Sequence, residues 1–175
     1  MTSLSTHPSI APTPDATRKA GRRLALAWSA TNAMSNTSTM LRVAFASDDR
    51  TTVNQHFGAA AGFAIYAVDG ERWQLVELAE FPPESMDGNE TKLPAKIAAL
   101  AGCAAVYCLA AGGSAVKQLL AAGIQPMRLD DGVRIEALLK QLGTAIKDGG
   151  IPWVDKALRD DAGRFERMVA DGWDE

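Results

Sequence analysis

Histidine and cysteine, which bind transition metals in many proteins, are scarce in this chain of 175 residues. The chain has two of each, and His56 is the only histidine outside the Ser/Thr/Pro-rich beginning. Cys103 and Cys108 lie too close together in an apolar run to suggest the disulfide framework of a secreted protein. We therefore expect a reducing, cytoplasmic location. One histidine and two cysteines at this spacing match no recognised metal signature.

The sequence also lacks a basic excess and a long apolar run. It carries 18 Lys and Arg against 21 Asp and Glu. The four basic residues before Met40 face only Asp15, so the remainder is more acidic than the total suggests. Without a basic stripe, nucleic acid is not the expected partner. No apolar run approaches the roughly 20 residues that a membrane helix needs, so no membrane association is expected either.

The chain divides into three parts. Residues 1–39 are rich in Ser, Thr and Pro without a hydrophobic period, and we expect a disordered extension. The stretch GRRLALAWSA in this extension has too short an apolar part for a targeting leader. Residues 40–150 predict a cofactor-binding α/β domain, and residues 151–175 predict a tail of marginal helices that docks weakly.

Three strands are predicted in the first half of that domain. The apolar run 41–46 predicts a buried strand. The runs 62–68 and 73–80 flank Asp69-Gly70 and predict an antiparallel hairpin. The polar connection that follows should end where Asn89 or Thr91 can cap a helix.

The second half alternates helices and strands. We expect a helix that ends at Gly102, followed by a strand at 104–109. The next helix should bury Val116, Leu119 and Leu120 and end at Gly123, before a strand at 124–129. A last helix after Asp131 should have its apolar face at Ile135, Leu138, Leu139, Leu142 and Ile146. A hairpin followed by this alternation predicts a mixed five-stranded sheet with helices on both faces, a three-layer α/β/α fold.

The stretch VNQHFGAAAGF places His56 in the loop after the first strand, where an open sheet presents ligand-contacting groups. An imidazole can bind iron, and Gly58 lets a bulky ligand approach the backbone. His56 has an alternative role, which is to cap the short turn through Ala59 to Ala61. The spacing alone leaves both roles open.

Other candidates have equally plain alternatives. Cys108 ends the fourth strand and offers a soft thiolate, but such cysteines are more often buried in the core. Gly113 and Ser114 open a helix whose free N–H groups can receive an anion, without matching a nucleotide-binding motif. Asp48 and Asp49 resemble paired acid-base carboxylates but suit an exposed turn better.

Five segments resemble one family. These are RVAFASDD to VNQHFG, FAIYAV, DGNETKL, GCAAVYCLAAGGSAVKQLLAAGIQP and GGIPWVDKAL. Together they are similar to the nitrogenase iron-molybdenum cofactor biosynthesis family, the group of NifX, NifY, NafY and the NifB C-terminal domain, and most of all to its NifX branch. The likeness spans residues 41–158. Family members commonly have Asp where this chain has Asn54, and residues before Met40 have no clear family counterpart.

The resemblance implies a ribonuclease-H-like α/β/α fold and a non-enzymatic role. The protein would bind an iron-sulfur precursor of the iron-molybdenum cofactor, such as NifB-cofactor, and carry it from NifB toward the NifE/NifN scaffold. The family's cluster-associated histidine falls on His56. The cofactor-binding residues expected from the loop and the helix start are Gln55, His56, Phe57, Gly58, Gly113 and Ser114, with His56 and Cys108 as candidate metal ligands.

Two other functions are compatible with the sequence. A metal-dependent nuclease of ribonuclease-H type would use Asp48 and Asp49, but needs further carboxylates. A cluster-free module would instead bind nitrogenase assembly proteins directly.

Overall fold

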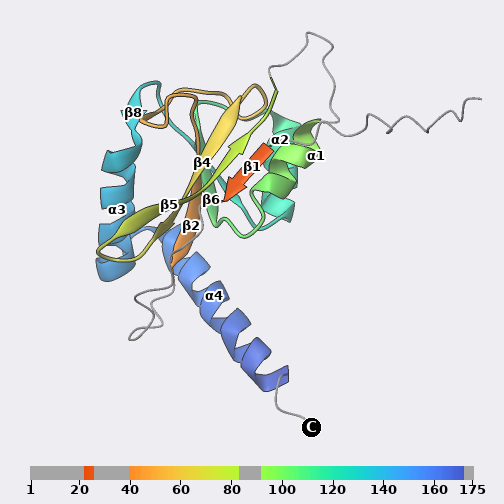
Figure 1. Cartoon of the computed structure of the whole chain (residues 1–175). Coiled ribbons are helices and arrows are strands. Elements are labelled where there is room, and N and C mark those ends of the chain that lie inside the picture. Colours follow the sequence, from red (N-terminus) through yellow and green to blue (C-terminus); the bar gives the residue numbers. More distant parts are fainter. Residues whose placement is uncertain (1–21, 26–39, 83–91, 172–175) are drawn as a thin grey trace, which may run out of the picture.

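A mixed sheet lies at the centre of the molecule (Figure 1). The computed structural model describes residues 22–25, 40–82 and 92–171, with side chains over 40–82 and 92–162. The strand order is β1-β5-β4-β2-β6-β7. The strands are β1 (Arg22–Ala25), β2 (Leu41–Ala46), β4 (Gly62–Val68), β5 (Trp73–Glu80), β6 (Ala105–Cys108) and β7 (Gln125–Arg128).

The strand directions confirm the predicted hairpin and crossovers. β4 runs antiparallel to both β2 and β5, whereas β6 runs parallel to β2 and β7. Asp69 Oδ1 accepts the amides of Glu71 and Arg72 at 2.8 and 2.7 Å and so closes the turn between β4 and β5. The predicted mixed sheet is confirmed, and the ribonuclease-H-like comparison stays a prediction.

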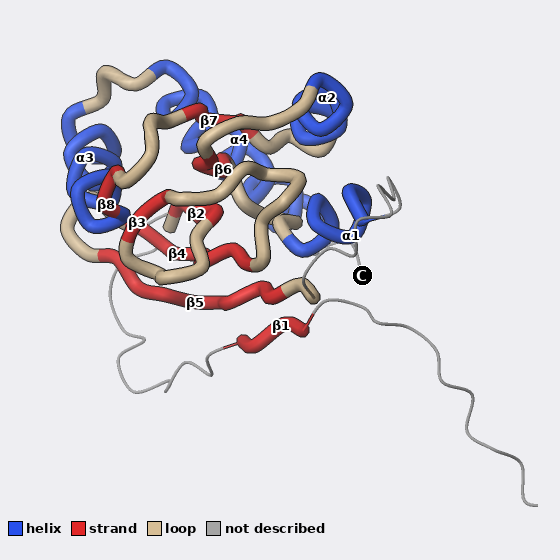
Figure 2. Tube along the Cα trace, turned by 90° about the horizontal axis from the view of Figure 1, so that it is seen from above, coloured by secondary structure: helices blue, strands red, loops and turns tan. Residues whose placement is uncertain are grey.

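The sheet has one strand more than predicted. β1 pairs antiparallel with β5 from Arg22 opposite Glu80 to Ala25 opposite Glu77. Figure 2 shows β1 along the outer side of β5. These residues fall within the segment expected to be disordered, where no strand was predicted. Without this pairing β5 would be an edge strand with unpaired backbone N–H and C=O groups. The short strand β1 supplies hydrogen-bond partners for these groups.

Helices cover both faces of the sheet. α1 (Lys92–Ala99) and α2 (Gly113–Ala121) lie on one face, and α3 (Ile135–Asp148) lies on the other (Figures 1 and 2). The predicted three-layer arrangement is confirmed. A separate two-stranded sheet, β3 (Thr52–Val53) with β8 (Val133–Arg134), joins the loop after β2 to the start of α3, and it was not predicted.

Two apolar clusters fill the layers because β2 is buried on both faces. Ala44 and Ala46 pack toward α1 and α2, whereas Val43 and Phe45 pack toward α3. Phe45 stacks on Tyr107 with ring centroids 5.2 Å apart. Successive residues of a strand point to opposite faces, so one continuous apolar run serves both layers.

The helices end near the glycines that were predicted to stop them, but the predicted burial of one residue is wrong. Gly102 and Gly123 follow α1 and α2 with φ of 84° and 75°, a conformation that glycine adopts without steric cost. Leu119 is buried as predicted, whereas Leu120 is 53% exposed. α2 packs through Ala115 and Leu119, so its buried stripe is narrower than predicted. The predicted caps Asn89 and Thr91 lie outside the described residues.

The C-terminal tail forms one helix rather than several marginal ones. α4 (Pro152–Asp171) packs its beginning against the α3 side of the core through Trp153, Val154 and Leu158. It then leaves the sheet near the start of β2, at the end opposite the loops that carry His56 (Figure 1). Within the described part of the chain, no helix has the length and apolar character to cross a bilayer.

Candidate functional site

The loop from Ser47 to Ala61 follows β2 and is ordered by its own side chains. Asn54 Nδ2 donates to Asp48 Oδ1 at 2.6 Å, and the Asp48 amide donates back to Asn54 Oδ1 at 3.3 Å. Asp49 Oδ1 accepts the amides of Thr52 and Thr51 at 2.8 and 2.7 Å, and Asp49 Oδ2 accepts the Thr52 hydroxyl at 2.7 Å. The Thr52 amide and hydroxyl and then the Thr51 amide hold the pKa of the Asp49 carboxyl well below its usual range.

His56 is exposed at the far end of this loop, beside the loop that follows β6. The Leu109 amide donates to the Gln55 carbonyl at 3.0 Å, and the Phe57 amide donates to the Ala110 carbonyl at 2.8 Å. The residues on either side of His56 are therefore both bonded to the segment that leads into α2. The loop of His56 therefore lies against Leu109 and Ala110, which precede α2 in the chain.

The turn around His56 is closed by its neighbours. Gln55 Oε1 accepts the Ala61 amide at 2.7 Å, and the Phe57 carbonyl accepts the Ala60 amide at 3.4 Å. None of the hydrogen bonds among the described residues uses the His56 imidazole. The alternative role of His56 as the cap of this turn is therefore filled by Gln55, and the imidazole is left facing solvent.

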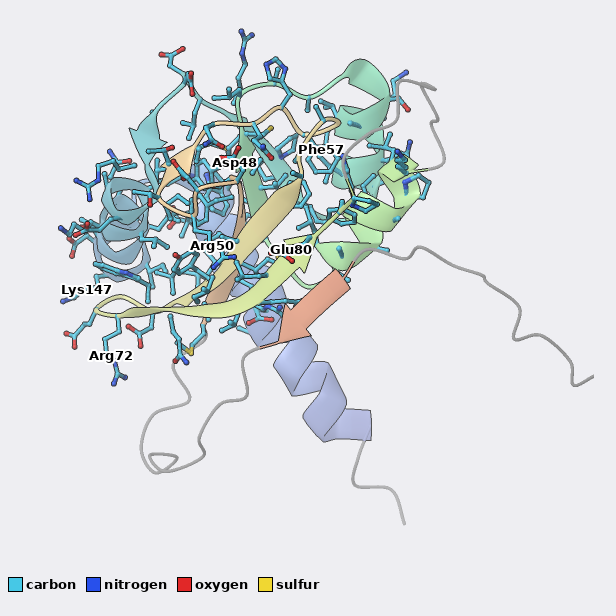
Figure 3. All side chains as sticks on the ribbon, turned by 45° about the horizontal axis from the view of Figure 1, so that its top comes forward. Asp48, Arg50, Phe57, Arg72, Glu80 and Lys147 are labelled. Carbon is cyan, nitrogen blue, oxygen red and sulfur yellow. The ribbon has the colours of Figure 1, made fainter. Side chains whose placement is uncertain are left out.

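Phe57 has a place that differs from the other expected cofactor-binding residues. Its side chain is 0% exposed and contacts Phe63 at a centroid distance of 5.4 Å. Figure 3 labels Phe57 and Asp48, which come from the same loop region at the end of the sheet. Because the ring belongs to the core, only the backbone of Phe57 is placed to face a ligand.

The start of α2 presents unoccupied amides. Gly112 is the N-terminal cap residue and has an extended backbone, and no side chain caps the helix. Gly113 and Ser114 are both exposed, and the side-chain Nε2 of Gln118 donates to Ser114 Oγ at 3.1 Å. Lys117 is also exposed on the same helix. Free N–H groups and a lysine give this edge a positive potential suited to an anion.

Cys108 does not reach this surface. It is 1% exposed within the core cluster that also contains Phe57 and Val106. Burial raises the pKa of the Cys108 thiol, and the nearby Phe57 amide offsets this only in part. Cys103 is likewise 5% exposed in the same cluster. The structure thus gives both cysteines the surroundings of core residues. A ligand role for Cys108 stays a prediction, because its thiol is buried away from solvent.

Replacing Cys108 by serine tests these two roles. A core position predicts a loss of about 1–3 kcal/mol in the free energy of unfolding, because the buried hydroxyl lacks the partners it has in water. Cluster retention should stay at the wild-type level. Urea unfolding of the apo-protein and anoxic gel filtration of the loaded protein measure the two properties. Cys108→Ala is the control, since it removes the sulfur without adding a polar group. If both variants are instead as stable as wild type and both lose the cluster, Cys108 is a ligand.

A cavity of about 250 Å³ is lined by residues from both ends of the same loop, from the start of β4 and from the end of β5. Asp48, Arg50, Phe63 and Glu80 are among its lining residues, and Arg50 Nη2 lies 3.6 Å from Glu80 Oε1 (Figure 3). Arg50 has a φ of 59°, which a non-glycine residue adopts at some cost. The ion pair is half-exposed, and the cavity contains neither His56 nor the start of α2.

The described residues do not provide the ligands that a metal-dependent nuclease needs. No group of three or more His, Cys, Asp or Glu side chains converges within the part of the chain that the structure describes. Asp49 is committed to the loop, and Asp48 is paired with Asn54. Nothing in this part of the chain therefore favours the nuclease alternative.

Sequence reasoning missed one residue next to the site. Lys96 of α1 is 1% exposed, and its Nζ donates to the Gly58 carbonyl. A signal for it was present: Leu93, Lys96, Ile97 and Leu100 follow the spacing of a buried helical stripe, so Lys96 interrupts an apolar face. A charged residue at such a position requires a buried partner.

The chain that forms this α/β/α domain matches a known protein family. The family described as dinitrogenase iron-molybdenum cofactor matches residues 39–145. The chain therefore belongs to this family.

Within the family the chain is similar to NifX proteins. NifX of Azotobacter vinelandii is 49% identical over 141 residues, which cover 78% of this chain and 89% of that protein. NifX of Klebsiella pneumoniae is 33% identical over 135 residues, covering 74% and 81%. The FeMo cofactor biosynthesis protein NifB of Chlorobaculum tepidum is 37% identical over 98 residues, which cover 55% of this chain and 22% of that protein.

Proposed function

We propose that this protein serves the biosynthesis of the nitrogenase iron-molybdenum cofactor as a cytoplasmic, non-enzymatic carrier. It binds an iron-sulfur precursor cluster, receives it from NifB and delivers it to the NifE/NifN scaffold. Family membership and the similarity to NifX proteins support the pathway. The carrier role rests on one observation, the exposed His56 held beside the uncapped start of α2.

The geometry suits a cargo that must be released. His56 offers one imidazole ligand, and the amides of Gly113 and Ser114 with Lys117 offset the negative charge of an iron-sulfide cluster. A single exposed ligand with weak electrostatic support binds less tightly than a closed cage of ligands. Modest affinity allows fast dissociation, which transfer to a scaffold requires.

The hydrogen-bonded backbone around His56 supports binding without a large rearrangement. The two hydrogen bonds to Leu109 and Ala110 hold the loop at both sides of His56. Because the backbone that carries His56 is already held, it loses little conformational entropy when the imidazole binds a cluster. The turn that presents His56 to a cluster is shaped by Gln55, Gly58 and the backbone of Phe57.

The experiment is an anoxic titration of the full chain with purified NifB-cofactor. The apo-protein should be colourless, and the loaded protein should show broad iron-sulfur absorption that co-elutes with it in gel filtration, together with iron. Failure to retain the cluster would refute the carrier role. If apo-protein binds NifE/NifN as tightly as protein that was supplied with cluster, the cluster-free interaction module is favoured over the carrier role.

A further inference from the structure

Lys96 is the one lysine of α1 that is buried. Lys92, one turn earlier on the same helix, is half-exposed, whereas Lys96 is 1% exposed. An ammonium group loses its hydration when it is buried, so it stays in such a position only where it gains bonds. The groups that Lys96 contacts therefore bear on its role.

Lys96 contacts the turn that carries His56. Its Nζ donates to the carbonyl of Gly58, which is 38 residues away in sequence. The same nitrogen lies 5.8 Å from the centroid of the Phe81 ring, a favourable position for a cation. Gly58 itself is exposed, and a Cβ built on it would meet nothing within 4 Å. The turn thus faces solvent on one side and rests on a buried lysine on the other.

The turn is held from two directions. Backbone bonds to Leu109 and Ala110 fix the residues on either side of His56, and Lys96 fixes the carbonyl two residues after it. The first attachment comes from the loop after β6 and the second from α1. Two attachments from different elements define the orientation of a short turn better than one.

We propose that Lys96 is a positioning residue of the cluster site, holding the turn of His56 to Gly58 in the conformation that receives the cluster. This inference rests on the proposed function. Groups that orient a metal ligand without touching the metal lower metal affinity about 10- to 100-fold when they are removed.

The test compares variants of the full chain by anoxic titration with NifB-cofactor. Lys96→Met keeps the volume and removes the donor, and we expect its affinity to fall about 10-fold. Lys96→Arg keeps a cationic donor, and Lys92→Met removes the same charge from the same helix. We expect both to stay within about 3-fold of wild type, since neither loses the cationic donor to the turn.

A readout without cluster separates positioning from a general loss of structure. In apo Lys96→Met, hydrogen exchange at the Phe57 and Ala61 amides should be faster, because the turn has lost one attachment. Exchange at core amides of β2 and the melting temperature should match wild type. Lys96→Leu likewise removes the donor and replaces Lys96→Met in the same comparison if the methionine variant does not fold.

The outcomes distinguish this inference from the function on which it rests. Wild-type affinity of Lys96→Met, while His56→Ala loses cluster, would overturn the positioning role and leave the carrier role intact. An equal loss in Lys92→Met would reduce the effect to net charge and overturn it as well. Unchanged affinity in both Lys96→Met and His56→Ala would overturn the proposed site itself.

Discussion

Replacing His56 by alanine should weaken cluster binding about 10-fold or more while leaving the fold unchanged. The imidazole is exposed and makes no hydrogen bond among the described residues, so its removal should change the free energy of unfolding by under about 0.5 kcal/mol. As a cluster ligand it has no substitute among the described residues, because His56 is the one histidine that they contain. Loss of one of very few protein ligands has a large effect on affinity.

The measurement is an anoxic titration of wild type and variant with NifB-cofactor, paired with urea unfolding of both apo-proteins. His7→Ala is the matched control, because it removes the same side chain from the segment before the domain. His56→Gln keeps a polar side chain without an imidazole and should behave like His56→Ala. If His56→Ala binds as tightly as wild type but unfolds at lower urea, His56 has a structural role.

Most of the fold was readable from hydrophobic periodicity. The strands at 41–46, 62–68 and 73–80 have the predicted boundaries, and the apolar face of α3 contains the predicted Ile135, Leu138 and Leu142. These segments bury enough apolar surface for their pattern to decide their structure. The glycine stops after α1 and α2 follow from backbone conformation alone.

The elements that were missed depend on partners that sequence does not reveal. β1 and the pair of β3 with β8 are short, and a strand of two to four residues is stable only where another strand supplies its hydrogen bonds. Leu120 matches a helical stripe, but the width of the buried stripe depends on how closely α2 approaches the sheet. Such distances are tertiary properties.

The site was only partly predictable for the same reason. The position of His56 after a strand at the carboxyl edge follows from the order of the elements, and so does the start of α2. The backbone bonds of Gln55 and Phe57 to the segment after β6, and the contact of Lys96 with Gly58, join residues that are far apart in sequence. Periodicity marked Lys96 as unusual but gave no partner for it.

Phe57 illustrates how adjacent residues divide binding from support. The sequence HFG suggested that His56, Phe57 and Gly58 all face the cofactor, but the Phe57 ring is 0% exposed while His56 and Gly58 are exposed. The ring lies among Ala46, Phe63 and Cys108 in the cluster beneath α1 and α2. Phe57 therefore anchors the loop to the core, and its neighbours are presented to solvent as a result.

Replacing Phe57 by alanine should lower the free energy of unfolding strongly, whereas replacing His56 should lower cluster affinity and leave stability unchanged. Truncation of a fully buried phenylalanine costs about 3–5 kcal/mol, which is a large part of the roughly 5–15 kcal/mol of total stability of a domain. Urea unfolding of apo-protein should show this loss directly. Phe57→Leu, which fills more of the same space, should lose less. If the Phe57→Ala fold is as stable as wild type while cluster affinity falls, the ring contacts the cluster rather than the core, and the turn must rearrange when the cluster binds.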